Sequence, residues 1–198
     1  AGTAAAESQT STGFSLQSVS FPTDTRFTQL LGINDRNIIV GYHGDENTEQ
    51  TPNKGFALDL PKNFVDENYP NSVQTQVVGI NNHNETVGFY IDQAGSTHGF
   101  QRKDDEFTTV DLPGTTFNQL LGINDKGQEA GYFQDANGLQ HAYVHQTNGN
   151  FLVLNIPMPS SQATGINKDG TVVGFEQSSP AATTASGWML KGGKLTLI

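Results

Sequence analysis

The sequence predicts an all-β protein, a four-bladed β-propeller, and three observations support that prediction. A six-residue motif that contains Gly-Ile-Asn occurs four times, at residues 29–34, 76–81, 119–124 and 162–167. The motif glycines lie 47, 43 and 43 residues apart. Each is followed nine residues later by a second glycine with an aromatic residue behind it. Repetition at a fixed period near this length is typical of solenoids and propellers.

Each motif is predicted to be the innermost strand of its repeat. A turn rich in Asn, Asp and Gly follows it at residues 35–37, 82–84, 125–127 and 168–170. Such residues accept left-handed backbone and bond their own main chain, so they favour tight hairpins. The second strand carries the second glycine, at residues 38–42, 86–90, 128–133 and 171–175.

A third and a fourth strand complete each predicted blade. The third strand covers residues 55–58, 98–100, 141–144 and 187–190. The pattern of the fourth strand is clear at residues 107–113 and 151–157 and weak near residues 64–66. Alternating polarity and β-branched residues match strands, and no long window has helical periodicity.

The two ends of the chain predict how the ring closes. Residues 14–22 and 194–198 both resemble a fourth strand, so the N-terminal strand is expected to join the last blade. A closed ring leaves only short, protected edges. Residues 14–198 would then be one domain, with repeats at about 23–70, 71–114, 115–158 and 159–198. The alternative, an open stack of repeats, would need polar caps that the sequence does not contain.

The motifs resemble a known family. Residues 122–127 and 141–143, with their Gly-Ile-Asn-Asp-Lys-Gly and His-Ala-Tyr strings, are similar to the HAF repeat of extracellular bacterial proteins. The resemblance covers residues 28–198 and departs where Lys54 and Ser186 replace the histidine. It implies a propeller-like extracellular repeat and offers no chemistry to carry over.

Composition limits the class of partner. Acidic side chains outnumber basic ones by 20 to 10, which gives a formal charge of −10. A surface of this sign repels phosphate backbones, so we expect no nucleic-acid partner. No apolar run reaches the length needed to span a bilayer, so no membrane partner is expected either. The chain has no cysteine, which excludes thiol chemistry and disulfides. Residues 1–13 are expected to be a disordered lead, and the protein to be secreted.

Residues present in all four copies are predicted to be scaffold. The motif asparagines, for example, are expected to satisfy backbone groups at the turn. The motif glutamines could instead ring a central channel and hold water, an ion or a ligand group. The alternative role for them is hydrogen bonding between blades. These glutamines are Gln29, Gln76, Gln119 and Gln162.

Polar residues that differ between copies are the candidate ligand site. They cluster in the long loops between the second and third strands, where binding residues usually lie. The candidates are Asp45, Asp92, Asp135 and Phe133. Aromatic rings beside carboxylates and amides suit hydroxyl-rich ligands. We therefore expect a secreted binding module for a glycan or another small polar ligand. The three aspartates could also bind calcium, but separate blades would hold them too far apart.

The alternative function is an enzyme that needs no cofactor. Ring closure would bring His43 and Glu176 onto adjacent blades, as an acid and base pair. Arg26 could stabilise an anionic oxygen and Tyr90 could transfer a proton. That set suits isomerisation, elimination or ring closure. No catalytic motif of a named type is present, and no metal site or cofactor is predicted.

Overall fold

The computed structural model describes residues 13, 16–24, 27–44, 52–60 and 63–198. The described chain is all-β and forms four antiparallel sheets, each made of four consecutive strands. The first sheet comprises β1 (Thr28–Ile33), β2 (Ile38–His43), β3 (Lys54–Asp59) and β4 (Asn63–Asp66). The second comprises β5 (Gln74–Ile80), β6 (Thr86–Ile91), β7 (Thr97–Lys103) and β8 (Glu106–Thr109).

The other two sheets repeat this order. The third comprises β9 (Asn118–Ile123), β10 (Glu129–Gln134), β11 (Gln140–His145) and β12 (Phe151–Val153). The fourth comprises β13 (Ser160–Ile166), β14 (Val172–Gln177), β15 (Ser186–Lys191) and β16 (Lys194–Leu197). The predicted four-strand repeat is thus confirmed, with the motif in the first strand of every sheet.

A one-residue bulge explains why the motif glycine and the second glycine occur together in every repeat. The register between the first two strands of each sheet shifts by one residue, in the first sheet between Leu30 and Gly32. The same shift occurs in the other three sheets. Opposite it stands the second glycine, as in the pair of Val77 and Gly88. Bulges increase the local twist of a strand, and glycine is the residue that fits such close approaches.

The motif asparagines are scaffold, as the sequence predicts. The Oδ1 atom of Asn81 accepts hydrogen bonds from the backbone N–H groups of His83 (2.9 Å) and Glu85 (3.0 Å). Its Nδ2 atom donates to the carbonyl oxygen of Asn124 in the next sheet, 3.1 Å away. Equivalent bonds run from Asn34 to Asn81 (3.0 Å) and from Asn124 to Asn167 (2.9 Å). The four asparagines therefore form a ladder that links the inner strands.

Small apolar side chains fill the space between consecutive sheets. At each boundary, a residue of the second strand of one sheet shares a buried cluster with a residue of the first strand of the next. These pairs are Val40 with Val77, Val87 with Leu120, and Ala130 with Ala163. All six side chains are fully buried.

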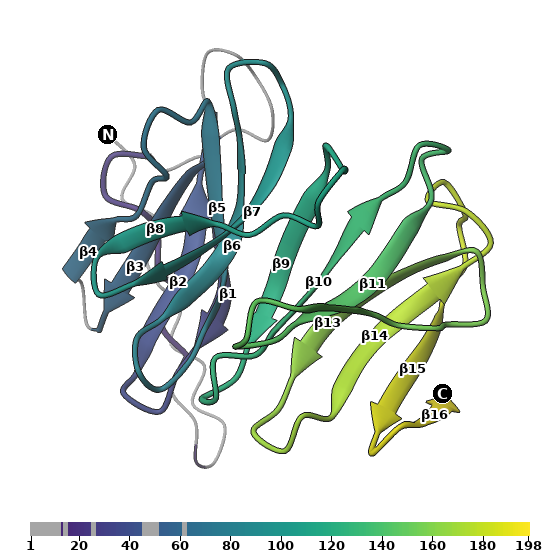
Figure 1. The fold of residues 1–198 in the computed structure, drawn as a ribbon. Helices are drawn as coiled ribbons and strands as arrows, with labels where there is room; N and C mark the ends of the chain where they lie inside the picture. Colours follow the sequence, from purple (N-terminus) through teal and green to yellow (C-terminus); the bar gives the residue numbers. More distant parts are fainter. Residues whose placement is uncertain (1–12, 14–15, 25–26, 45–51, 61–62) are drawn as a thin grey trace.

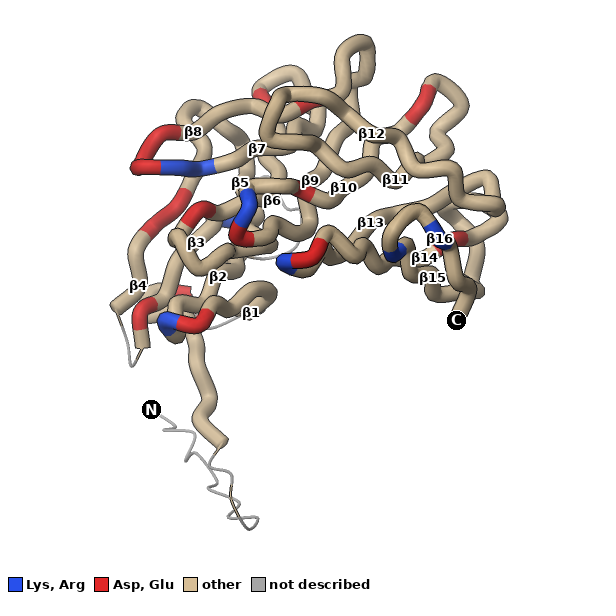
Figure 2. Tube along the Cα trace, turned by 60° about the horizontal axis from the view of Figure 1, so that its bottom comes forward, with Lys and Arg blue, Asp and Glu red and all other residues tan. Residues whose placement is uncertain are grey.

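The predicted ring is not closed. Among the described strands, packing joins consecutive sheets, and the first and last sheets stand at opposite ends of the arrangement (Figures 1 and 2). The expected closing strand is also absent, because residues 16–22 form no strand. Instead Phe21 packs beside Phe56 and Phe64 of the first sheet. The end of the N-terminal segment therefore lies against the first sheet, where Phe21 contacts these two aromatic rings.

Candidate functional site

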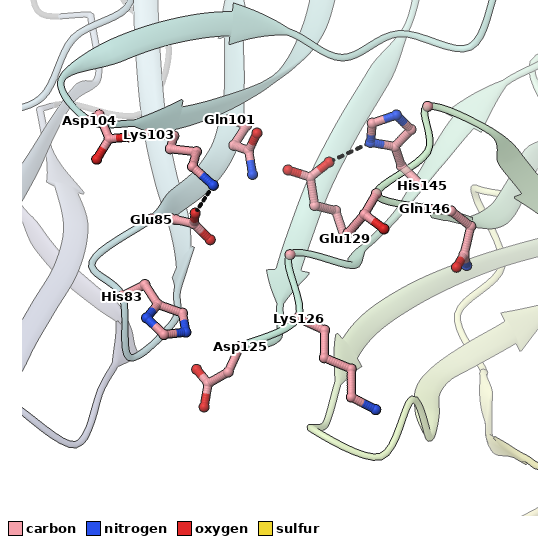
Figure 3. Close-up of a pocket in the computed structure, with 13 residues that line it drawn as sticks. His83, Glu85, Gln101, Lys103, Asp104, Asp125, Lys126, Glu129, His145 and Gln146 are labelled. Carbon is pink, nitrogen blue, oxygen red and sulfur yellow. Dashed lines mark hydrogen bonds and ion pairs between the residues drawn. The ribbon is translucent and has the colours of Figure 1, made fainter.

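A polar groove lies between the second and third sheets (Figure 3). We call it the inter-sheet groove; it has a volume of about 620 Å³. Its walls come from the turns that follow β5 and β9 and from the ends of β7 and β11. Its lining includes the side chains of Glu85, Lys103, Glu129 and His145.

Glu129 is the most unusual residue of the groove, because its carboxylate is only 1% exposed. One oxygen, Oε2, lies 2.7 Å from Nδ1 of His145. The other, Oε1, has no hydrogen-bond partner among the described residues. In Figure 3 the carboxylate lies between the side chains of Gln101 and His145. Burial raises the pKa of Glu129, and the contact with His145 offsets this effect only in part.

Glu85 and Lys103 form an ion pair in the second-sheet wall of the groove. Nζ of Lys103 lies 2.6 Å from Oε1 of Glu85, and Nδ2 of Asn81 donates to Oε2 of Glu85, also at 2.6 Å. Burial alone would raise the pKa of Glu85, but these two partners outweigh it and hold the pKa below its usual value. Both oxygens of Glu85 are therefore engaged, in contrast to those of Glu129.

A second buried carboxylate serves as an internal comparison. Glu67 is 2% exposed, and burial raises its pKa as well. Thr86 donates to one of its oxygens, and Arg102 lies 3.4 Å from the other. Glu67 does not line the inter-sheet groove. Of these two buried carboxylates, Glu129 alone combines an unpartnered oxygen with a place in the groove.

The raised pKa values predict a pH effect on stability. A carboxyl whose pKa rises on folding favours the folded state at low pH, and this contribution is lost as pH rises through the raised value. Relative to wild type, Glu129→Gln should therefore gain free energy of unfolding as pH rises above the usual value of 4.5. Urea denaturation at a series of pH values measures the difference. Glu67→Gln should behave alike, because burial raises the pKa of Glu67 as well.

The structure does not bring the predicted catalytic residues together. His43 is in β2 of the first sheet and Glu176 in β14 of the last. The His43 ring stacks on Phe21 at 3.6 Å, and Oε2 of Glu176 accepts the Met158 N–H at 3.2 Å. Their expected adjacency depended on ring closure, so it is wrong. Arg26 lies outside the described residues.

Tyr90 is a packing residue of the second sheet. Its ring stacks on Tyr69 with centroids 3.7 Å apart, and its hydroxyl lies 3.0 Å from Oγ1 of Thr109. Burial, with the neighbouring Tyr69, raises the pKa of Tyr90 to about 12. A phenol with such a pKa is a poor base near neutral pH.

The loop aspartates hold their own turns. Oδ1 of Asp92 accepts from the N–H groups of Ala94 (2.8 Å) and Ser96 (2.9 Å), and Oδ2 lies 3.2 Å from His98. Asp135 makes the equivalent bonds in the third sheet, with Oδ2 2.9 Å from His141. Their repetition at the same offset from the second glycine is thus explained by turn formation. Asp45 lies outside the described residues.

Phe133 and the motif glutamines are half-buried. The Phe133 ring stacks on His141 with centroids 5.1 Å apart. Gln119 accepts from the Tyr132 hydroxyl at 2.8 Å, within its own sheet. Gln162 donates to Gln140 of the third sheet at 2.8 Å, which is the bonding between blades named above as the alternative. No hydrogen bond is described for the side chains of the other two, Gln29 and Gln76.

Sequence reasoning missed Glu129 and His145, although a signal was present. The two residues face each other across β10 and β11. The equivalent cross-strand pairs are Ile39 with Leu58 in the first sheet, and Val172 with Leu190 in the fourth. The second sheet has the polar pair Thr86 and Arg102 at this place. A carboxylate and an imidazole thus replace a pair that is apolar in the first and fourth sheets. Comparison of the copies along the strands, rather than in the loops, would have identified them.

Two further findings concern the part of the chain that the structure describes. It contains no group of three or more His, Cys, Asp or Glu residues placed to hold a metal ion. It also contains no helix with the length and apolar character to cross a membrane.

Comparison with known proteins identifies a family and a fold. A family model described as "Protein of unknown function (DUF3466)" matches residues 15–188. No curated protein matches the chain significantly. Among solved structures, TolB from Acinetobacter baumannii is 10% identical, with a TM-score of 0.63 over 86% of this chain. A mutant of AofleA from Arthrobotrys oligospora is 15% identical, with a TM-score of 0.55 over 94%.

A third similar structure is the Aleuria aurantia lectin, described as a six-bladed β-propeller that recognises fucose. It is 9% identical, with a TM-score of 0.49 over 81% of this chain. This chain spans 43% of the length of TolB, 62% of AofleA and 55% of the lectin. At such low identity the likeness shows the fold alone. The described chain is a succession of four antiparallel sheets, and TolB and AofleA share this all-β arrangement.

Proposed function

The chain belongs to the DUF3466 family, whose description assigns no function, and we propose from its own side chains that it binds a small polar ligand in the inter-sheet groove. The observation that carries this proposal is the unpartnered Oε1 atom of Glu129. A buried polar atom without a hydrogen bond costs free energy, and a ligand hydroxyl or amine that donates to it would recover that cost.

The charges of the groove favour a ligand that carries an amine. Four carboxylates and two lysines line it, namely Glu85, Asp104, Asp125 and Glu129 with Lys103 and Lys126. A cleft with this excess of negative charge attracts cations. Amide side chains such as Gln101 and Gln146 could bind hydroxyls. An amino sugar combines both groups, so sugars remain the ligand class that we propose first.

The test compares glucosamine with glucose as probes. We expect glucosamine to bind more tightly at low salt, with one site per chain by calorimetry. Glu129→Gln keeps the shape of the side chain and removes its charge, so affinity for glucosamine should fall about tenfold, since a hydrogen bond to a charged group is worth roughly 1.5–3 kcal/mol. Amide signals of the groove residues should shift in NMR spectra on addition of glucosamine.

Glu67→Gln is the matched control, because it alters a carboxylate that is equally buried but fully partnered and outside the groove. It should leave glucosamine affinity unchanged. Equal affinity of wild type and Glu129→Gln for every sugar and amino sugar tested, or no binding by wild type, would contradict the proposal. The acid–base enzyme is not retained, because its His43 and Glu176 lie in the first and last sheets.

A further inference from the structure

The first and fourth sheets each expose one side chain that, at its equivalent position in the other sheets, is buried between two consecutive sheets. At the three boundaries between consecutive sheets, the residue just before the second glycine shares a buried cluster with a residue of the next sheet. That partner stands two positions before the motif glycine of its own sheet. In the fourth sheet the residue just before the second glycine is Val173, and in the first sheet the residue two before the motif glycine is Leu30. Val173 is 42% exposed and Leu30 is 43% exposed, whereas their six equivalents are fully buried.

The asparagine ladder is also open at both ends. Asn167 offers its amide on the exposed side of the fourth sheet, and no bond from it to another sheet is described. At the other end, the carbonyl oxygen of Asn34 accepts the N–H of Asn37 in its own turn. Unlike those of Asn81 and Asn124, it receives no side-chain amide from a preceding sheet in the described chain. One end thus presents a donor and the other an acceptor.

The glycines of the inner strands show the same asymmetry. A Cβ atom added to Gly122 would stand 3.1 Å from the Cα atom of Gly165, so these strands touch closely. A Cβ on Gly165 would meet only Val173 of its own sheet, at 3.4 Å. The fourth sheet therefore has the shape that receives a further inner strand, and no described residue occupies that place.

The turn that follows the asparagine adds complementary charge. The backbone N–H of Asp35 donates to Asn82 of the next sheet, and that of Asn82 donates to Asp125, each at 2.8 Å. Lys168 holds the equivalent place in the fourth sheet. A first sheet docked against the fourth would bring Asp35 beside Lys168, and opposite charges favour that register.

We propose that the fourth sheet of one molecule binds the first sheet of a second copy of this chain, head to tail. The fourth-sheet face consists of Val173, Gly165 and Asn167, and the first-sheet face of Leu30, Gly32 and Asn34. The second copy is the partner because it carries both faces in matching register. Such a contact joins two different surfaces, so it produces either a ring or an open stack of copies.

The experiment uses the full chain and two charge substitutions, Leu30→Asp and Val173→Asp. Both side chains are exposed in the monomer, so the sheets should fold normally. Light scattering after gel filtration should give wild-type species at twice 21.3 kDa or a higher multiple, which dissociate on dilution. Each variant should associate at least tenfold more weakly. Mixing the two variants should restore a heterodimer, because each retains the face that the other has lost.

Val153→Asp is the matched control, since Val153 is comparably exposed but lies on the outer strand β12. It should associate as wild type does. If an Asp variant of Leu30 or Val173 fails to fold, Asn167→Asp tests the same face, because it removes the amide donor and keeps the oxygen that accepts from Asp169 and Thr171. It should weaken association. Wild type that stays monomeric at every concentration would overturn the proposal. Association that both Asp variants leave unchanged, or variants that do not complement on mixing, would also overturn it.

Discussion

Replacement of Gly88 by alanine is expected to abolish cooperative folding. A Cβ atom at this position would overlap the carbonyl oxygen of Gln76 in the paired strand and approach Cε1 of Phe100 to 3.0 Å. The carbonyl belongs to a bulged backbone ladder, and the Phe100 ring is fully buried, so neither can move aside. Overlap with fixed atoms puts Gly88→Ala among the rare changes that cost more than about 4 kcal/mol.

Gly165→Ala is the control for this prediction. It adds the same methyl group to an inner strand, but the nearest atom is Cγ2 of Val173 at an ordinary contact distance of 3.4 Å. At protein concentrations low enough to prevent association, its cost should stay near 1 kcal/mol or below. Urea denaturation followed by circular dichroism measures both variants. A Gly88→Ala protein with the midpoint of wild type would show that the bulge does not require glycine.

The four-strand repeat could be predicted because its causes are local. The turns after the motif need residues that accept left-handed backbone, and Asn37 and Asn84 adopt positive φ there. The second glycine is needed at the bulge in every copy, so it appears in the sequence at a constant offset. These requirements act within one sheet and leave a periodic signal.

Closure could not be predicted, because it depends on packing between distant segments. In the strand-like pattern before Pro22, Phe21 becomes buried and Val19 partly buried, whereas Leu16 is 72% exposed. The pattern does not say which sheet buries Phe21, and this ring packs on the first. The resemblance to the HAF repeat and the extracellular location stay predictions.

The described ligand residues predicted from the sequence do not line the inter-sheet groove. Divergence between copies was applied to loop residues such as Asp92 and Asp135, and these hold their own turns. Glu129 lies in a strand, where an apolar residue is the usual occupant. Its importance follows from burial and from an unpartnered oxygen, and neither can be read from sequence alone.

Asn81→Ala should have the second-largest effect on stability. The substitution removes four hydrogen bonds at a buried position: two accepted by Oδ1 within the turn, and two donated by Nδ2 to Glu85 and Asn124. The backbone N–H groups and the Asn124 carbonyl would lose these partners. Since each net hydrogen bond is worth about 1 kcal/mol, and unmet buried groups cost more, we expect a loss of about 3–4 kcal/mol.

The comparison with Asn167→Ala separates the ladder from the turn. The Asn167 side chain caps its own turn through the N–H groups of Asp169 and Thr171, but it is exposed and makes no described bond to another sheet. At protein concentrations low enough to prevent association, its replacement should cost about 1 kcal/mol. Urea denaturation of both variants measures the difference. Equal losses would mean that the asparagines stabilise turns alone; a larger loss for Asn81→Ala would mean that they also hold neighbouring sheets together.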